Sequence, residues 1–292
     1  MQSPHVFFEG RITQRGSAVR RAEARALRPA YVEPTEDAGS FLNTLFGIAD
    51  LPVKSYRGRA LARRLPACLR YLRADNPEHA SLKIWENPEL ATAALNVVLL
   101  GVTEFFRDSA VFDHLGQHVL PTMLGETARP RIWSAACSEG HELYSVAMQL
   151  AAMDRLQGCE LVGTDCRAEA IDQAASGLFE CATLAQIAPC WRNYFTETRS
   201  SAVIDPELRS CTTWKVADLL RETEPGPWHL ILWRNMAIYL ETSAADAVWQ
   251  QLSDELAPGG FLVGGKADHP PKWLPLDRVG PCTYRKRDVY PL

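Results

Sequence analysis

No apolar run in the sequence is long enough to cross a bilayer. The longest, Ala91 to Val102, contains Asn96 and is shorter than the roughly 18 to 20 residues that a membrane-spanning helix needs. The first residues also lack the basic segment followed by an apolar one that marks a secretory signal. We therefore expect a cytoplasmic protein with no stable membrane insertion.

Cysteine pairs and zinc-ligand patterns are missing as well. The eight cysteines are dispersed without a Cys-x-x-Cys pair, and no histidine stands at the spacing of a zinc site. This pattern favours reduced thiols, which we expect to be mostly buried, and predicts no metal site. The net charge of −4 argues against a general nucleic-acid binder.

Apolar residues are plentiful enough for a sizeable core. Hydrophobic residues make up 47% and charged residues 23% of the 292 positions, which excludes a disordered or fibrous class and suggests two domains. The acidic total hides a basic stretch, because residues 54–73 include no acidic residue. This stretch favours an acidic protein as partner. Its basic residues are Lys54, Arg57, Arg59, Arg63, Arg64, Arg70 and Arg73.

The hydrophobic pattern divides the chain into three parts. Residues 1–36 show little periodicity, and we treat them as an extension that is partly disordered. Residues 37–125 follow helical spacing, and Pro66 suggests that a new helix begins near it, because a helix interior tolerates proline poorly. Residues 126–292 alternate β-rich and helical runs, which predicts a parallel sheet with crossover helices. The expected strands are 131–136, 160–164, 230–233, 261–264 and 282–287.

The first strand-to-helix turn is the place to look for a ligand, because ligands of open α/β sheets bind at the carboxyl ends of the strands. Residues 134–142 (SAACSEGHE) contain small residues and one glycine, Gly140. One glycine does not match the three-glycine dinucleotide fingerprint, and an ordinary tight turn explains it equally well. Asp165 ends the second strand, where a carboxylate accepts hydrogen bonds from ribose hydroxyls or caps the next helix. Together they indicate a nucleoside-containing ligand, without choosing between NAD and S-adenosylmethionine.

Five segments carry a resemblance to a known family. They are 103–108 (TEFFRD), 132–145 (IWSAACSEGHELYS), 163–165 (GTD), 233–239 (WRNMAIY) and 256–261 (LAPGGF). In order and spacing they resemble the CheR-type chemotaxis receptor glutamate methyltransferases, over about residues 37–287. The resemblance implies an α/β protein, with an all-helical N-terminal domain before a Rossmann-like S-adenosylmethionine-dependent methyltransferase domain. That second domain would carry a small antiparallel β subdomain at about residues 179–216.

The resemblance also implies an activity, the formation of methyl esters on glutamate side chains of a chemoreceptor or related signalling protein. S-adenosyl-L-methionine would be the cofactor and S-adenosyl-L-homocysteine the product. Arg107 and Tyr239 are the catalytic residues that it implies, with Asp165 on the ribose and Asp218 beside the adenine. A glutamate carboxylate, with a pKa of about 4.3, is ionised at neutral pH and needs no general base. The implied cofactor-binding residues are Thr103, Arg107, Glu142, Asp165, Asp218, Leu219, Arg234 and Asn235.

In the same family, arginines of the second helix meet the acidic methylation helix of the receptor. Lys54, Arg57 and Arg64 fall at i, i+3 and i+10 and are expected to share one helix face for this contact. A merely solvated cationic face explains them nearly as well.

Three departures from the family pattern keep an alternative open. His141 stands in place of a glutamate, Trp233 in place of a cysteine, and Lys266 within a replaced Gly-His-Ser-Glu run. We expect neither His141 nor Lys266 to be a catalyst, and a solvated or locally bonded side chain is the expectation for each. The alternative function is a degenerate cofactor-binding relative that acts as a docking or regulatory module without methyl transfer. An NAD-dependent dehydrogenase is a more distant alternative, because the turn lacks its glycines.

Overall fold

The computed structural model describes residues 36–99, 101, 103–185 and 187–288. The extension expected at residues 1–36 lies outside the described residues except for Glu36, which begins the first described helix. Within the described ranges, no helix combines the length and the apolar character needed to cross a membrane.

The N-terminal part consists of helices packed against one another, as predicted. In the first of them, Phe41, Leu42, Leu45 and Phe46 form a buried stripe at helical spacing. The third begins with Asn76 as its N-cap, which accepts a hydrogen bond from the backbone N–H of His79 at 2.8 Å. These helices are called the helical domain below. They are α2 (Glu36–Ile48), α3 (Gly58–Leu72), α4 (Pro77–Glu86) and α5 (Leu90–Leu99), with a 3-10 turn η1 (Val53–Ser55) before α3.

The prediction that a helix begins near Pro66 is wrong, because Pro66 lies inside α3. A proline there removes one backbone hydrogen bond and strains the preceding turn. The helix nevertheless continues to Leu72, since Leu61, Cys68 and Leu72 are buried on both sides of the proline. Tertiary packing therefore outweighs the local penalty of the proline.

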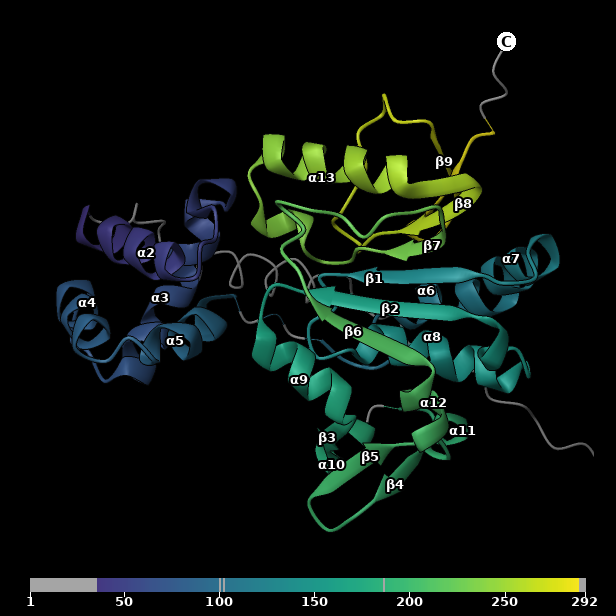
Figure 1. Cartoon of the computed structure of the whole chain (residues 1–292), viewed down its shortest axis with the longest axis horizontal. Coiled ribbons are helices and arrows are strands. Elements are labelled where there is room, and N and C mark those ends of the chain that lie inside the picture. The colour runs from purple at the N-terminus through teal and green to yellow at the C-terminus, as the bar shows by residue number, and fades with distance from the viewer. Residues whose placement is uncertain (1–35, 100, 102, 186, 289–292) are drawn as a thin grey trace, which may run out of the picture.

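The C-terminal part is built around a seven-stranded sheet in the order β6-β2-β1-β7-β8-β10-β9 (Figure 1). The first five strands in this order are parallel, and β10 pairs antiparallel with both β8 and β9. Every expected strand is present, whereas β6 and β9 were not anticipated. The strands are β1 (Arg131–Ala135), β2 (Glu160–Asp165), β6 (Thr212–Val216), β7 (Trp228–Leu232), β8 (Leu256–Val263), β9 (Leu276–Gly280) and β10 (Thr283–Lys286).

Two apolar cores lie on the two faces of this sheet. One core joins Trp133 and Trp233 of the sheet domain to Trp249 of α13 (Thr242–Glu255), and it continues into the helical domain through Phe41. The other core lies beneath α8 (His141–Ala152). The shared first core fixes the helical domain against the sheet domain, beside which it lies in Figure 1.

The segment before β1 packs with the sheet domain and not with the helical domain. Phe112, Leu115 and Leu120 belong to the same core as α8. We therefore propose a domain boundary near residue 101, rather than at residue 125 as the sequence pattern indicated. The segment comprises α6 (Ser109–His114), a π-helical turn η2 (Leu115–Val119) and α7 (Leu120–Glu126).

A small antiparallel sheet, in the order β3-β5-β4, forms the subdomain that the resemblance implied. It follows α9 (Ala168–Ser176), and its residues Phe179 and Ile204 are buried in the core under α8. Its elements are β3 (Leu178–Glu180), α10 (Cys181–Leu184), α11 (Pro189–Arg192), β4 (Phe195–Glu197), β5 (Ser201–Ile204) and α12 (Pro206–Ser210).

The expectation of mostly buried cysteines is wrong. All eight thiols are free, but only Cys68 and Cys137 are buried, while Cys190 is exposed and the others are half-buried. Burying a small thiol removes less apolar surface from water than burying a long apolar side chain. A cysteine at the end of an element therefore gains less free energy from burial.

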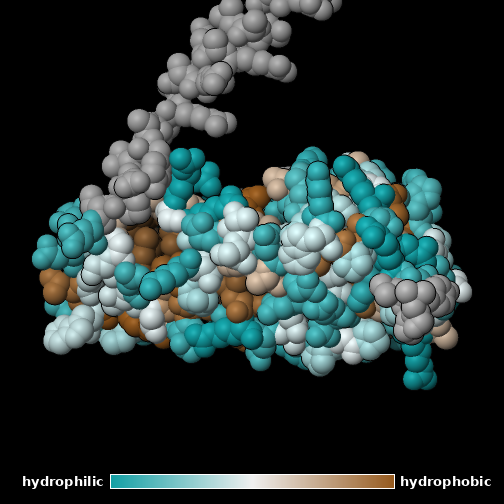
Figure 2. Space-filling model, turned by 90° about the horizontal axis from the view of Figure 1, so that it is seen from above, coloured by the Kyte–Doolittle hydropathy of each residue, from teal (hydrophilic) through white to brown (hydrophobic). Residues whose placement is uncertain are grey.

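The surface of the helical domain carries apolar as well as basic side chains. Trp85 is 82% exposed and Leu82, one helical turn earlier on α4, is 56% exposed. In Figure 2 apolar residues gather towards the left of the molecule, on the side of the helical domain, while much of the remaining face is hydrophilic.

Candidate active site

A cleft opens where the parallel strands β1, β2, β6 and β7 end, and the helical domain lines its other side. Every residue expected to act in catalysis or cofactor binding lines this cleft. The nine are Thr103, Arg107, Glu142, Asp165, Asp218, Leu219, Arg234, Asn235 and Tyr239. Residues scattered over more than a hundred positions of sequence are thus brought to one place.

The structure explains why the first turn contains a glycine at position 140. Gly140 has φ of +83°, and a Cβ atom there would lie 2.5 Å from the ring of Trp214 on β6. Both observations require glycine, because other residues rarely adopt this φ and no side chain would fit. The turn is therefore shaped by the packing of Trp214 in addition to any ligand.

The segment Thr103–Asp108 is held by its two phenylalanines. Phe105 is buried against Phe179 of the subdomain, with ring centroids 4.9 Å apart. Phe106 stacks on Trp191, with centroids 4.9 Å apart and an interplanar angle of 22°. These aromatic contacts anchor the segment between the sheet and the subdomain, with Thr103 and Arg107 on the cleft.

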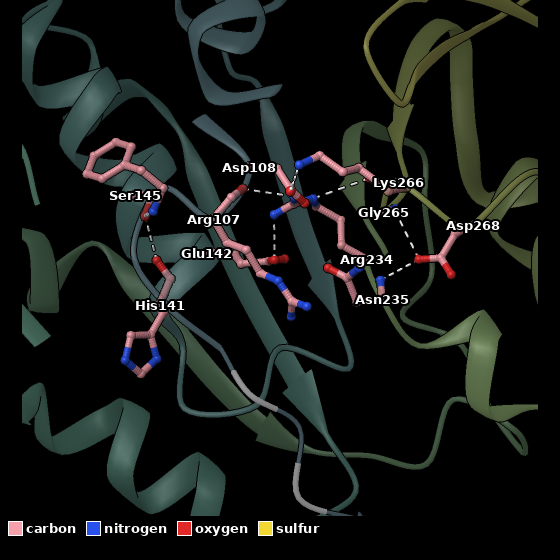
Figure 3. Close-up of polar contacts among 12 residues, drawn as sticks. Arg107, Asp108, His141, Glu142, Ser145, Arg234, Asn235, Gly265, Lys266 and Asp268 are labelled. Carbon is pink, nitrogen blue, oxygen red and sulfur yellow. Dashed lines mark hydrogen bonds and ion pairs between the residues drawn. The ribbon is translucent and has the colours of Figure 1, made fainter. Parts of the chain in front are cut away.

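Arg234 connects this segment to the first turn (Figure 3). Its side chain has no exposed surface, and its Nη1 donates to Glu142 Oε1 at 2.6 Å. Its Nη2 donates to Asp108 Oδ2 and to the carbonyl oxygen of Arg107, both at 2.9 Å. Its Nε donates to the carbonyl oxygen of Gly264 at 3.3 Å. Arg234 thus fixes the backbone from which the Arg107 side chain extends.

Glu142 and Lys266 complete this charged group. Burial raises the pKa of the Glu142 carboxyl, although Arg234 and Arg107 act to lower it. Lys266 Nζ lies 2.5 Å from Asp108 Oδ1, and the lysine side chain is mostly exposed. Lys266 is thus a locally bonded side chain, as expected.

His141 is not the solvated or locally bonded residue that the sequence suggested. The residue is 4% exposed, and its ring packs between Phe105 and Phe179, at centroid distances of 4.6 and 4.7 Å. Burial lowers its pKa to about 4. The apolar surroundings of His141 favour the neutral imidazole.

Asp165 is oriented from two sides. Its Oδ2 accepts from the backbone N–H of Ser138 at 2.8 Å, and its Oδ1 accepts from the backbone N–H and Nε of Arg167, both at 3.0 Å. Arg167 is buried and donates from Nη2 to Ser138 Oγ at 2.8 Å. The three residues form one network that fixes the Asp165 carboxylate at the end of β2.

Two acceptor atoms on the cleft are left without hydrogen bonds among the described residues. They are Asp218 Oδ2, which has only a 3.5 Å ion-pair contact with Arg221, and Asn235 Oδ1. Both atoms are buried, and burial raises the pKa of Asp218. Buried acceptors without donors are costly. The cleft therefore fits a ligand with amino groups to donate, such as an adenine and an ammonium.

Tyr239 and Trp233 come from the segment after β7. Tyr239 ends a 3-10 turn, η4 (Ala237–Tyr239), and its backbone carbonyl accepts from the N–H of Arg57 at 2.8 Å. Trp233 is fully buried and packs edge-on against Trp249, with centroids 4.6 Å apart. The tryptophan at this departure from the family pattern is thus part of the core as well as of the cleft wall.

Lys54, Arg57 and Arg64 do not share one helix face, so that prediction is wrong. Lys54 lies in η1, Arg57 is the N-cap of α3, and only Arg64 lies within the helix. Arg57 donates from Nε to the carbonyl oxygen of Leu240 at 2.5 Å. Residues at i, i+3 and i+10 share a face only within one continuous helix, whereas here the chain turns between η1 and α3. None of the three lines the cleft.

Sequence reasoning missed three residues of the site. Ser138 and Arg167 bind Asp165, and Tyr56 of the helical domain lines the cleft. The neighbourhood of Asp165 was a signal for Arg167, which stands two positions later. No local signal pointed to Tyr56, because its place depends on how the two domains pack.

The comparisons with known proteins agree on one family. Residues 101–273, more than half of the chain, match the family described as CheR methyltransferase, SAM binding domain. A probable chemotaxis protein methyltransferase of Rhizobium etli is 30% identical over 63% of this chain and 74% of that protein. A chemotaxis protein methyltransferase of Listeria monocytogenes is 28% identical over 59% of this chain and 66% of that protein. A putative methyltransferase of Pseudomonas putida, Cher3, is 24% identical over 80% of this chain and 89% of that protein.

The matched residues contain the first turn, the end of β2 and the segment after β7, and they supply most of the residues that line the cleft. Its buried acceptors and oriented carboxylate suit S-adenosyl-L-methionine, the ligand that the family description names. The chain belongs to the CheR methyltransferase family, and S-adenosyl-L-methionine is its cofactor.

Proposed function

We propose that this methyltransferase modifies glutamate side chains of a chemoreceptor or related signalling protein, giving glutamate methyl esters. The relatives named as chemotaxis protein methyltransferases support this substrate class. A cytoplasmic location and an acidic helical segment as the methylation site belong to the same proposal.

In this proposal the adenosine half of the cofactor lies between Asp165 and Asp218. Asp165 accepts from the ribose hydroxyls, and the unpaired Oδ2 of Asp218 accepts from the adenine amino group, with Leu219 beside the ring. Asn235 Oδ1, the other unpaired acceptor, takes the ammonium group. Thr103 and Glu142 border the remaining part of the cleft.

Arg107 is proposed to bind the carboxylate end of the cofactor and the approaching substrate. Arg234 supports it indirectly, because the Arg234 guanidinium already donates to Glu142, Asp108 and the Arg107 carbonyl. We therefore assign Arg234 to the positioning of Arg107, and not to direct cofactor contact as the resemblance implied.

The chemistry requires positioning more than proton transfer. When bound, S-adenosyl-L-methionine supplies a methyl group activated by a sulfonium. The substrate carboxylate is ionised at neutral pH, so no residue of the chain needs to remove a proton. Arg107 and Tyr239 would orient the substrate carboxylate towards this methyl group and exclude water. Oriented approach of this kind supplies several kcal/mol, up to about 7 to 11 in favourable cases.

The observation that carries this proposal is the convergence of Arg107, Asp165 and Tyr239 on one cleft. These residues come from the segment before α6, the end of β2 and the turn η4. A module that only held the cofactor would need Asp165 and Arg107 but would have no use for Tyr239 at the same opening.

The test is incubation with methyl-labelled cofactor and membranes that contain chemoreceptors, followed by alkali. Glutamate methyl esters release labelled methanol in base, and we expect that release. A protein that binds S-adenosyl-L-homocysteine but transfers no base-labile methyl group to any receptor would be the docking module instead.

A further inference from the structure

The helical domain forms one wall of the cofactor cleft. Tyr56 lines the cleft from the end of η1, Ala60 and Leu61 from the start of α3, and Val98 and Leu99 from the end of α5. Among these, only Tyr56 carries a polar side-chain atom. The helical domain is thus in a position to touch the cofactor, and of its described residues on the cleft Tyr56 is the one with a polar side-chain atom.

Tyr56 lies beside the residues proposed to bind adenosine. Its side chain is 4% exposed. Burial raises the pKa of its hydroxyl, and the nearby Cys166, Asp218 and Asp165 raise it further. The hydroxyl is therefore neutral at physiological pH and offers one donated hydrogen bond. Tyr56 lines the same cleft as Asp165 and Asp218, the two carboxylates proposed for the ribose and for the adenine.

The backbone around Tyr56 is fixed to the segment that carries Tyr239. Tyr56 forms an antiparallel bridge with Leu240. On either side of it, Glu241 N–H donates to the Ser55 carbonyl and Arg57 N–H donates to the Tyr239 carbonyl, both at 2.8 Å. These bonds hold Tyr56 against the active-site turn.

Two further contacts join the helical domain to the other cleft segments. Asn96 of α5 donates to Glu169 of α9, and α9 follows the end of β2 at which Asp165 stands. Arg221, three residues after Asp218, forms an ion pair with Asp50. With the Tyr56–Leu240 bridge, each contact reaches a segment that carries a proposed cofactor or catalytic residue.

We propose that Tyr56 is a cofactor-binding residue supplied by the helical domain, and that its hydroxyl bonds the adenosine half of the cofactor. Binding of the cofactor then stabilises the docking of η1 and the start of α3 on the sheet domain. The inference rests on the placement of adenosine between Asp165 and Asp218, but it does not depend on glutamate as the substrate.

The first test measures ligand binding by calorimetry in the full chain with Tyr56→Phe. The ring contact with Phe46, at a centroid distance of 5.2 Å, remains in this variant, so folding is preserved and is checked by thermal unfolding. The probes are S-adenosyl-L-homocysteine and 5′-methylthioadenosine, which lacks the amino-acid part. We expect the Kd of both to rise by about 3- to 10-fold, the effect of one lost hydrogen bond.

Tyr144→Phe is the matched control. Tyr144 is also buried and donates to the carbonyl oxygen of Ala174 at 2.8 Å, but it does not line the cleft. The Tyr144→Phe variant should leave the Kd values of both probes unchanged. Arg107→Ala should weaken S-adenosyl-L-homocysteine but not 5′-methylthioadenosine. Unchanged affinities for both probes in Tyr56→Phe would overturn the assignment of Tyr56.

The second test is hydrogen exchange of residues 53–61 with and without S-adenosyl-L-homocysteine. Ligand should slow exchange there in the parent protein, and by a smaller factor in Tyr56→Phe. Exchange that does not respond to ligand in the parent protein would refute the coupling. Both readouts concern binding alone, so absence of methyl-ester formation would refute the proposed function and leave this inference standing.

Discussion

Arg234 and Glu142 form a buried ion pair, with Nη1 2.6 Å from Oε1 and no exposed surface on the arginine side chain. The same guanidinium binds Asp108 and the Arg107 carbonyl, so one residue joins the first turn, the interdomain segment and the end of β7. The pair organises the cleft before any ligand arrives.

Replacing Arg234 should be costly, because Glu142 would then be buried without a partner. We expect Arg234→Ala to lower the free energy of unfolding by about 3 to 5 kcal/mol, measured by urea denaturation. The control is Arg287→Ala, since Arg287 and its partner Asp277 are both more than half exposed. That change should cost less than about 1 kcal/mol. Equal decreases of the free energy of unfolding in the two variants would show that the buried Arg234–Glu142 pair stabilises the fold no more than an exposed pair does.

His141 should make the fold sensitive to acid. Its pKa is about 4 in the folded protein against 6.5 in the unfolded chain, so the unfolded state binds the extra proton between these values. The free energy of unfolding therefore falls as pH falls from about 6.5 to about 4, by up to roughly 3 kcal/mol from this residue.

The measurement compares denaturation curves of the parent protein and His141→Phe across this pH range. Their difference isolates the histidine, because the other titrating groups are common to both. The difference between the two unfolding free energies should change by up to roughly 3 kcal/mol across this range. Parallel curves for His141→Phe would contradict the neutral, buried assignment.

Asp165→Ala should weaken the binding of S-adenosyl-L-homocysteine by at least about tenfold. A hydrogen bond to a charged acceptor contributes about 1.5 to 3 kcal/mol, and two ribose hydroxyls are proposed to bind this carboxylate. Calorimetry provides the comparison, with Asp172→Ala on the exposed side of α9 as control. An affinity that does not change in Asp165→Ala would remove Asp165 from the cofactor site.

The sheet was largely predictable from sequence, because β1, β2, β7 and β8 are buried and read as apolar runs. Strand β6 (TTWKV) was missed because its sequence is neither a continuous apolar run nor a regular alternation of apolar and polar residues. Its burial is correspondingly irregular. Most of the motif residues lie on one cleft because they follow strand ends, whereas Thr103 and Arg107 reach it from the segment before α6, and the roles expected of them stay predictions. Tyr56 and the real position of Arg57 were not predictable, as both depend on contacts with residues about 180 positions away (Arg57 and Leu240 are 183 apart).

The basic surface near α3 should affect how quickly the substrate is found. Lys54→Glu with Arg64→Glu should slow association with an acidic receptor segment and reduce the salt dependence of that rate, because the steering field is removed. Arg57 is left in place, since it holds Leu240. Lys272→Glu, an exposed lysine outside the helical domain, is the control. Association rates that are the same in all three proteins would exclude this surface as the docking site.

The most direct test of the active-site assignment separates methyl transfer from cofactor binding in Arg107→Ala and Tyr239→Phe. If these residues position the reacting groups, transfer to receptor glutamates should fall by about 10²-fold, while the Kd of S-adenosyl-L-homocysteine rises far less. Losses of equal size in transfer and in binding, or transfer at the parent rate, would contradict the account.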